Sequence, residues 1–368
     1  MEGLEVTLIF HQQVTSAMLY RALSEGMYMN VCFTTCRVFA LLSCAVCLTV
    51  PLQLMGASPP EPYRETRMML HTLVEIKAYG DNVEEAVNAA FNEIERINLF
   101  LNNYDPKSEV SLLNRSAGLE AVAVSPETLE ALLLAQFYGR LTGGALDITI
   151  GPLLTLWGFT QEIPALEGGP PSPNELDKTK QIVDYNLINL DVINGTALLL
   201  KHGMCIDAGS FTKGYAVDRA ARVLKKNGVQ RALIAAGGTI LAVGKKSGGK
   251  YWQVGIRHPR HEGSLMGSVA LEDQAISTSG DYERFYRSGE RRICHIIDPR
   301  SGQPIESVQS ISVIAPSAMA SDALSTALFV LGAQEGINLV NNLPDTEALV
   351  VDQEGVKHTS RGWSAHQN

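Results

Sequence analysis

The sequence predicts an α+β fold in which largely antiparallel sheets carry flanking helices. Hydrophobic residues make up 45% and charged residues 19% of the 368 residues, which is the balance of a globular protein with a sizeable core. Between residues 231 and 315 several β-rich segments follow one another without helical periodicity between them. Consecutive strands of this kind favour antiparallel pairing, and we find no internal repeat.

The first predicted elements are a strand and an amphipathic helix. Residues 72–79 alternate between apolar and polar side chains, as a half-buried strand does, and residues 83–99 carry apolar side chains at three- and four-residue spacing. After a loop at 102–106, we expect helices at 109–114 and 126–142. Residues 162–176 contain Pro164, Gly168-Gly169, Pro170, Pro171 and Pro173, which indicates an insertion loop rather than a domain boundary.

The second half is expected to contain most of the strands. Strands are predicted at residues 197–201, 231–235, 239–243, 251–256, 267–271, 275–279, 292–297 and 309–315, with helices at 213–227 and 321–331.

The first 65 residues differ from the predicted domain at 66–368. Residues 38–50 form an uncharged apolar run after Arg37, and a proline-rich stretch follows at 59–62. This order is typical of a secretory signal or an N-terminal membrane anchor, with a buried core helix as the alternative. We therefore expect an exported protein.

The sequence does not decide how the leader is processed. Leu41-Leu42-Ser43-Cys44 resembles a bacterial lipoprotein cleavage box with Cys44 as the lipidated residue, but an uncleaved anchor or cleavage near Ala57 fits as well. A start at Met27 or Met29 would give a signal of more usual length. Four of the six cysteines lie in this leader, so the body has no disulfide framework.

The net charge of −9 argues against nucleic acid as a partner, because such binding depends on basic side chains that neutralise phosphates. Any phosphate ligand would have to be held by a local site, with a metal ion as the expected counter-charge.

Asp322 and Thr326 place a carboxylate and a hydroxyl four residues apart near the start of a helix, hence on one face. Two such oxygens suit Mg²⁺, which takes few protein ligands and completes its shell with water and phosphate. In the alternative interpretation, Ser321 and Asp322 are ordinary helix N-caps.

A second motif runs from Asp207 through Ala208-Gly209-Ser210 to Lys213, as a small-residue turn followed by a helix. Backbone N–H groups at such a turn can bind phosphate, and Lys213 can add a donor. The spacing is not that of a Walker loop, and a simple turn is the alternative.

Two further motifs suit a flat ligand and a base. Residues 143–153 combine small residues with Asp147 and a Gly-Pro break, which permits close backbone approach to a flat ligand that Tyr104 could stack on. His295, which precedes Ile-Ile-Asp-Pro, is a candidate base for a hydroxyl nucleophile. A tight turn and a core or capping histidine are the alternatives.

Taken in order, these motifs resemble the FAD:protein FMN transferase family, the ApbE-like flavin transferases. The resemblance extends over residues 66–345. Its matching stretches are 72–76, 103–110, 144–153, 207–218, 235–238, 255–259, 277–284, 295–302 and 322–326.

The resemblance implies the flavin transferase fold and a set of site residues. Mg²⁺ would be held by Asp322, Thr326 and an oxygen of Ser210, and His295 would be the base. The FAD site would be lined by Leu70, Tyr104, Ala145, Leu146, Asp147, Asp207, Lys213 and Ile297.

The family transfers FMN from FAD through a phosphoester to a Ser or Thr of a redox protein, within a Ser/Thr-Gly-Ala-Ser/Thr motif, and releases AMP. The resemblance thus implies action at the periplasmic face of the inner membrane. Two other functions remain open: an FAD pyrophosphatase that gives FMN and AMP, and an exported flavin-binding protein without turnover.

Two stretches depart from the family pattern. The chain has Leu70-His71-Thr72 where Met-Gly-Thr or Met-Asp-Thr is usual, and Asp207-Ala208-Gly209-Ser210 where Asp-Leu-Gly-Gly or Asp-Leu-Gly-Ala is usual. The first could alter flavin packing and the second the third metal ligand. Neither removes a charged group, so we expect activity to survive.

We predict that the purified protein does not label itself. The chain contains no Ser-Gly-Ala or Thr-Gly-Ala sequence, and a nucleophile must come within ~3–3.5 Å of the phosphorus to react. Mass spectrometry after incubation with FAD and Mg²⁺ alone should find only non-covalent FAD that acid releases. A stoichiometric FMN adduct on this chain would contradict the prediction.

Overall fold

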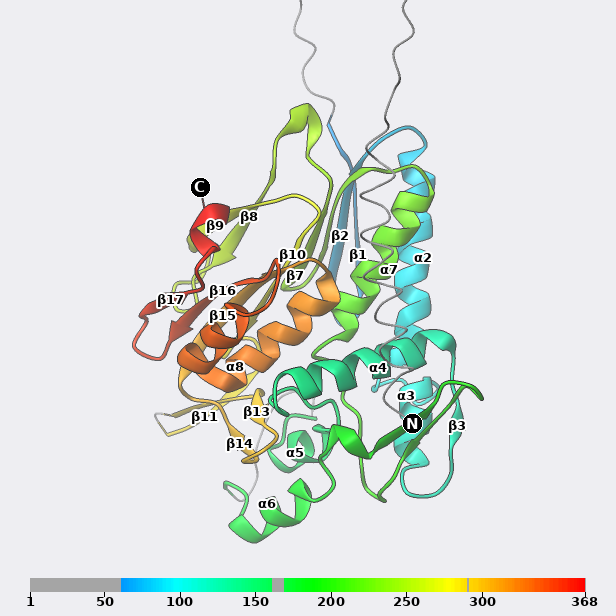
Figure 1. Ribbon diagram of the computed structural model, residues 1–368, viewed down its shortest axis with the longest axis vertical. Helices are drawn as coiled ribbons and strands as arrows, with labels where there is room; N and C mark the ends of the chain where they lie inside the picture. Colours follow the sequence, from blue (N-terminus) through cyan, green and yellow to red (C-terminus); the bar gives the residue numbers. More distant parts are fainter. Residues whose placement is uncertain (1–60, 161–168, 290, 368) are drawn as a thin grey trace, which may run out of the picture. The chain divides into compact units, whose positions relative to one another are not determined.

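The computed structural model describes residues 61–160, 169–289 and 291–367 (Figure 1). Its largest element is an eight-stranded sheet in which every neighbouring pair is antiparallel, so the predicted α+β class is confirmed. The predicted leader up to residue 60, including Cys44, lies outside the described residues, and so do residues 161–168 at the start of the expected insertion loop.

The eight strands are ordered β1-β2-β6-β7-β10-β15-β16-β17, with β1 at one edge. Their bounds are β1 Tyr63–Met69, β2 Thr72–Tyr79, β6 Arg231–Ala236, β7 Thr239–Val243, β10 Ala275–Gly280, β15 Val308–Ala315, β16 Glu347–Asp352 and β17 Lys357–Thr359. All eight residues of β15 are buried, because both faces of the sheet are covered where it lies.

Three helices cover one face of the sheet: α2 (Val83–Leu101), α7 (Thr212–Lys226) and α8 (Ala318–Val340). In Figure 1 α2 and α7 lie side by side, with α8 beside them. The hairpin of β8 (Trp252–Arg257) and β9 (Leu265–Leu271) covers the other face together with Trp363.

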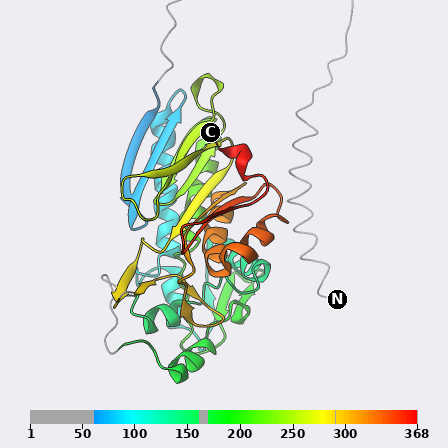
Figure 2. The same ribbon diagram turned by 90° about the vertical axis from the view of Figure 1, so that its left-hand side faces the viewer.

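Smaller elements complete the body (Figure 2). The helices are α3 Glu109–Arg115, α4 Pro126–Leu141, α5 Gly151–Leu156 and α6 Pro173–Lys180, with 3₁₀ turns at Tyr185–Leu187, Ser247–Gly249 and Trp363–His366. A three-stranded sheet contains β3 Val122–Ala123, β5 Thr196–Leu199 and β4 Ile188–Asp191; two-stranded sheets contain β11 Phe285–Ser288 with β12 Arg291–Cys294, and β13 Ile297–Asp298 with β14 Gln303–Pro304.

Two predicted elements need correction. Residues 173–176 are not loop but the first turn of α6, which begins with a capping box between Ser172 and Glu175 and has Pro173 at its first position. The strand expected at 292–297 ends at Cys294, and the chain forms the separate strand β13 from Ile297, where it pairs with β14.

The start of α8 is also corrected. The helix begins at Ala318 with Ser317 as its N-cap, whose hydroxyl accepts the N–H of Ala320 at 3.1 Å, so neither Ser321 nor Asp322 is the N-cap of α8. The expected end at residue 331 coincides with a break at Gly332, where φ is 77°. By length and composition α8 could span a membrane, but here it packs against β10, β15 and α7 as a core helix.

The first turns of α7 and α8 cap each other. The carboxylate of Asp218 on α7 accepts the N–H groups of Ala318 and Met319 at 2.8 and 2.9 Å, and the carboxylate of Asp322 on α8 accepts the N–H of Gly214 at 3.0 Å. Each helix therefore supplies the anion that the other helix needs at its N-terminus. Gly214 permits this approach, because a Cβ there would lie 2.3 Å from the carbonyl oxygen of Ala318.

We expect Gly214→Ala to lower the free energy of unfolding by about 1–3 kcal/mol, since the added methyl group meets rigid backbone and forces the helices apart. Gly267→Ala is the matched control, because a Cβ at this exposed strand position meets nothing within 4 Å. Urea unfolding of both variants is the measurement. Equal stability of the two would show that the helix contact tolerates a side chain.

Candidate active site

Asp322 lies between the start of α7 and strand β10. One oxygen, Oδ2, accepts the N–H of Gly214 and lies 3.6 Å from Nζ of Lys213; the other, Oδ1, accepts the hydroxyl of Ser277 at 3.3 Å. Only 6% of the side chain is exposed. The carboxylate is thus held from a helix on one side and from the sheet on the other.

A second hydroxyl supports Ser277. Thr239 on β7 is its direct cross-strand partner, and their hydroxyl oxygens are 2.8 Å apart. Because Ser277 gives its single hydroxyl proton to the carboxylate, Thr239 must donate to Ser277. This chain of two buried hydroxyls fixes the orientation of Asp322.

Thr326 follows Asp322 by one turn of α8 and is half-buried, and its hydroxyl makes no hydrogen bond with any described residue. Ser210 is also half-buried and precedes α7. Among the described residues there is no cluster of three or more His, Cys, Asp or Glu side chains that could enclose a metal. The donor set therefore fits Mg²⁺ only in a sparse site, in which substrate phosphate and water supply the other ligands.

The turn after Asp207 is closed by its own hydrogen bonds. The carboxylate accepts the N–H of Gly209 at 2.9 Å and the amide of Asn103 at 3.2 Å, and burial raises its pKa. Lys213 donates from Nζ to the carbonyl oxygen of Gly209 at 2.8 Å. The N–H of Asp207 also bonds to the carbonyl oxygen of Ile148 at 2.7 Å, which joins the second and third sequence motifs.

The segment at 145–147 is buried beside α8. Leu146 packs against Ala323 and Ala327, which directly follow the metal candidates Asp322 and Thr326 on α8. The carboxylate of Asp147 accepts bonds from the N–H and hydroxyl of Thr149 and from the N–H of Tyr185, and burial raises its pKa. With its oxygens engaged in this way, Asp147 holds the loop.

Two further candidates for the FAD site, Ala145 and Ile297, are also buried. Ala145 belongs to the core around α8, while Ile297 packs with Leu153 and Trp157.

His295 is half-buried and lies between β12 and β13. Burial, with the positive charges of Arg284 and Lys213, lowers the pKa of its imidazole to about 4. Its Nδ1 lies 3.2 Å from the carbonyl oxygen of Arg284, and a carbonyl can only accept, so Nδ1 carries the proton. The ring is therefore neutral at pH 7 and Nε2 has a free lone pair.

Arg284 connects His295 to the rim of the site, although the sequence analysis gave it no role. Its guanidinium donates to the carbonyl oxygen of Phe159 at 2.5 Å and to the hydroxyl of Tyr104 at 3.5 Å, and its charge acts on both His295 and Asp207. Arg284 ends the stretch 277–284 that matches the family, and this position was the one sign in the sequence that it belongs to the site.

Tyr104 is 51% exposed and its ring meets that of His71 edge-on, with centroids 5.2 Å apart. Leu70 and His71 form the two-residue turn between β1 and β2, and both have positive φ, 51° and 56°. Such angles cost side chains about 1–2 kcal/mol each. An edge-on aromatic pair stabilises a fold by about 0.5–1.5 kcal/mol.

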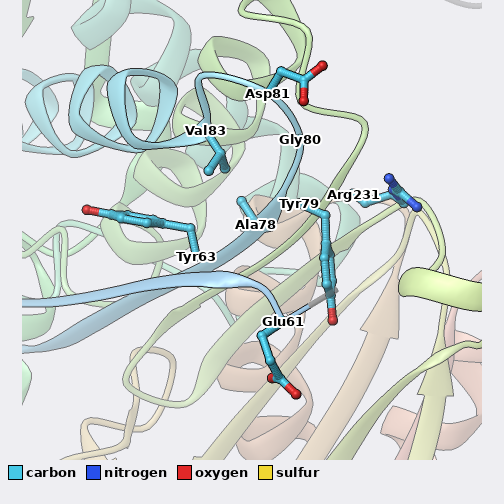
Figure 3. A pocket seen from close by; sticks show the side chains of 8 residues that line it. All are labelled: Glu61, Tyr63, Ala78, Tyr79, Gly80, Asp81, Val83 and Arg231. Carbon is cyan, nitrogen blue, oxygen red and sulfur yellow. The ribbon is translucent and has the colours of Figure 1, made fainter. Parts of the chain in front are cut away.

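A separate cavity of about 240 Å³ lies at the opposite end of the β1–β2 hairpin (Figure 3). It is lined by Glu61, Tyr63, Ala78, Tyr79, Gly80, Asp81, Val83 and Arg231. The paired strands separate it from the turn at Leu70 by roughly 20 Å, at about 3.3 Å per residue. It is smaller than the roughly 300–1,000 Å³ usual for sites of drug-sized ligands, so it is not a candidate for the FAD site.

The family model of ApbE matches residues 70–350, which include every site residue discussed above. The chain belongs to the ApbE family. An FAD:protein FMN transferase of Salmonella typhimurium is 32% identical over 314 residues, covering 80% of this chain and 88% of the relative. The Escherichia coli K12 protein of the same name is 34% identical over 246 residues, covering 65% and 69%.

Solved structures of ApbE proteins have the same fold. The ApbE protein from Thermotoga maritima matches with a TM-score of 0.78 and 31% identity, and covers 84% of this chain and all of its own. The flavin transferase ApbE from Vibrio cholerae matches with a TM-score of 0.74 and 28% identity, with the same coverage. The predicted family is therefore confirmed.

We predict that His295 stays neutral until the pH falls to about 4, whereas an ordinary histidine with a pKa of 6.5 is mostly protonated at pH 5. NMR of the imidazole carbons, with His295→Asn to assign the signal, measures the midpoint. Arg284→Gln should raise the midpoint but leave it below 6.5, because burial is the larger cause. A wild-type midpoint near 6.5 would contradict the assigned environment.

Proposed function

We propose that this ApbE family member is a Mg²⁺-dependent FAD:protein FMN transferase, which cleaves FAD and attaches FMN to a Ser or Thr hydroxyl of another protein. The observation that carries the proposal is the half-buried, neutral imidazole of His295, whose Nδ1 faces the carbonyl oxygen of Arg284 and whose Nε2 is unprotonated, together with the ion pair of Lys213 and Asp322. A base of this kind and a hard-cation ligand are what transfer from a diphosphate to a hydroxyl requires.

Positive charge and backbone donors would bind the diphosphate of FAD. Lys213 and Arg284 are the cations whose charges lower the pKa of His295. The turn from Asp207 to Ser210 ends at the N-terminus of α7, where N–H groups favour an anion. We assign the adenosine and isoalloxazine contacts to the walls formed by Ala145, Leu146, Ile297 and Tyr104.

The transfer moves one proton, forms one bond to phosphorus and breaks another. Nε2 of His295 accepts the proton of the acceptor hydroxyl as its oxygen bonds to the FMN phosphorus. The phosphoanhydride bond breaks and AMP leaves with the bridging oxygen. Mg²⁺ bound by Asp322, Thr326 and an oxygen of Ser210 would neutralise charge on the diphosphate. Thr239 and Ser277 keep the carboxylate in place throughout.

The proposed acceptor comes from the family resemblance, and the proposed location also from the leader. We propose a separate redox protein with a Ser/Thr-Gly-Ala-Ser/Thr motif as the acceptor, since this chain carries no Ser-Gly-Ala or Thr-Gly-Ala of its own. The apolar run at 38–50 supports export, with the enzyme held at the periplasmic face of the inner membrane by an anchor or a lipid on Cys44.

Thr326 provides the matched test of the metal assignment. Thr326→Val keeps the shape but removes the oxygen, so the Mg²⁺ concentration for half-maximal FMN transfer should rise at least about tenfold, whereas Thr326→Ser should stay within about threefold of wild type. Asp322→Ala should abolish transfer. Equal Mg²⁺ dependence of the Val and Ser variants would reject Thr326 as a ligand.

A further inference from the structure

The turn between β1 and β2 holds two side chains in a backbone conformation that glycine adopts freely. Met69 pairs with Thr72, which leaves Leu70 and His71 as a two-residue hairpin with φ of 51° and 56°. A hairpin of this type requires positive φ at both positions, and Asn-Gly is the usual choice. The bulky pair therefore needs an explanation other than the turn.

The contact between His71 and Tyr104 does not explain the pair by stabilising the fold. Its ring is exposed and touches Tyr104 edge-on at 5.2 Å with an angle of 73° between the planes. The gain from such a pair and the cost of the backbone are of similar size, as given above, so the fold gains little from His71. Backbone strain without a gain in stability is typical of a functional position.

Tyr104 is the residue that His71 affects. Its hydroxyl accepts a bond from Arg284 at 3.5 Å, while its ring contacts the ring of His71, so the side chain is held at two points. About half of it, 51%, remains exposed. A half-exposed ring with a fixed orientation is a surface on which a broad planar ligand can stack.

We propose that His71 is a positioning residue that holds Tyr104 for the isoalloxazine ring of FAD, and so determines affinity for the flavin half of the substrate. The inference rests on the proposed function, because it takes FAD as the substrate and Tyr104 as part of its site. It adds that His71 acts on the flavin half alone. The adenosine diphosphate half contacts other residues and does not depend on it.

The test compares three substitutions in the full chain. His71→Gly removes the ring and relieves the backbone, His71→Asn removes the ring but tolerates positive φ, and His71→Phe keeps an aromatic ring. Dissociation constants are measured by calorimetry for FAD and for ADP, which lacks the flavin. Thermal unfolding midpoints are recorded without ligand.

We expect the Gly and Asn variants to bind FAD about threefold to tenfold more weakly, to bind ADP as the wild type does, and to unfold at the same or a higher temperature. The Phe variant should keep FAD affinity within about threefold. Unchanged FAD affinity in the Gly and Asn variants, or an equal loss for FAD and ADP, would overturn the role of His71. Failure of the wild-type protein to bind FAD would instead reject the proposed function.

Discussion

The reciprocal capping of α7 and α8 is the interaction on which the candidate site depends. Asp218 and Asp322 each neutralise the N-terminus of the other helix, and Gly214 brings the two backbones into contact. Asp322 is thereby both a structural cap and the proposed metal ligand. The four-residue spacing between Gly214 and Asp218 is repeated between Ala318 and Asp322, so the two helices meet as near-equivalent partners.

Burial sets the chemistry of the groups around this contact. It raises the pKa of Asp207 and lowers that of His295 to about 4, which disfavours the charged form of each. Lys213 and Arg284 add positive charge that further disfavours a protonated imidazole. An acceptor base and two cations are thus kept together at neutral pH, an arrangement suited to a substrate that brings its own negative charge as a diphosphate.

The sequence predicted the fold class and most long elements, because periodicity reports which face of a strand or helix is buried. It missed β1, whose mixed composition gives no clear alternation, and α6, whose capping box lay within a proline-rich stretch taken as a loop. It placed the α8 cap at Ser321 instead of Ser317, since several serines fit equally well and tertiary contacts with Asp218 decide between them.

For the site, residue types at fixed spacing indicated Asp322 with Thr326 and the turn at Asp207. The contacts of Ser277 and Thr239 could not be predicted, because they arise from cross-strand register, and the matched stretch 277–284 contained Arg284 without indicating its bond to the distant Phe159. Asp147 was assigned to the FAD site by the family resemblance, and the bonds of its side chain to Thr149 and Tyr185 could not be predicted. Long-range contacts of this kind leave no periodic trace in a single sequence.

The central claim is that the site transfers FMN to a hydroxyl on another protein. The most direct measurement is incubation of the full chain with FAD, Mg²⁺ and a redox protein that carries a Ser/Thr-Gly-Ala-Ser/Thr motif, with intact mass spectrometry of the acceptor and quantification of AMP. The account predicts an acceptor that gains one FMN phosphoester and an equal amount of AMP. AMP and free FMN with an unmodified acceptor, or intact FAD with no product, would contradict it.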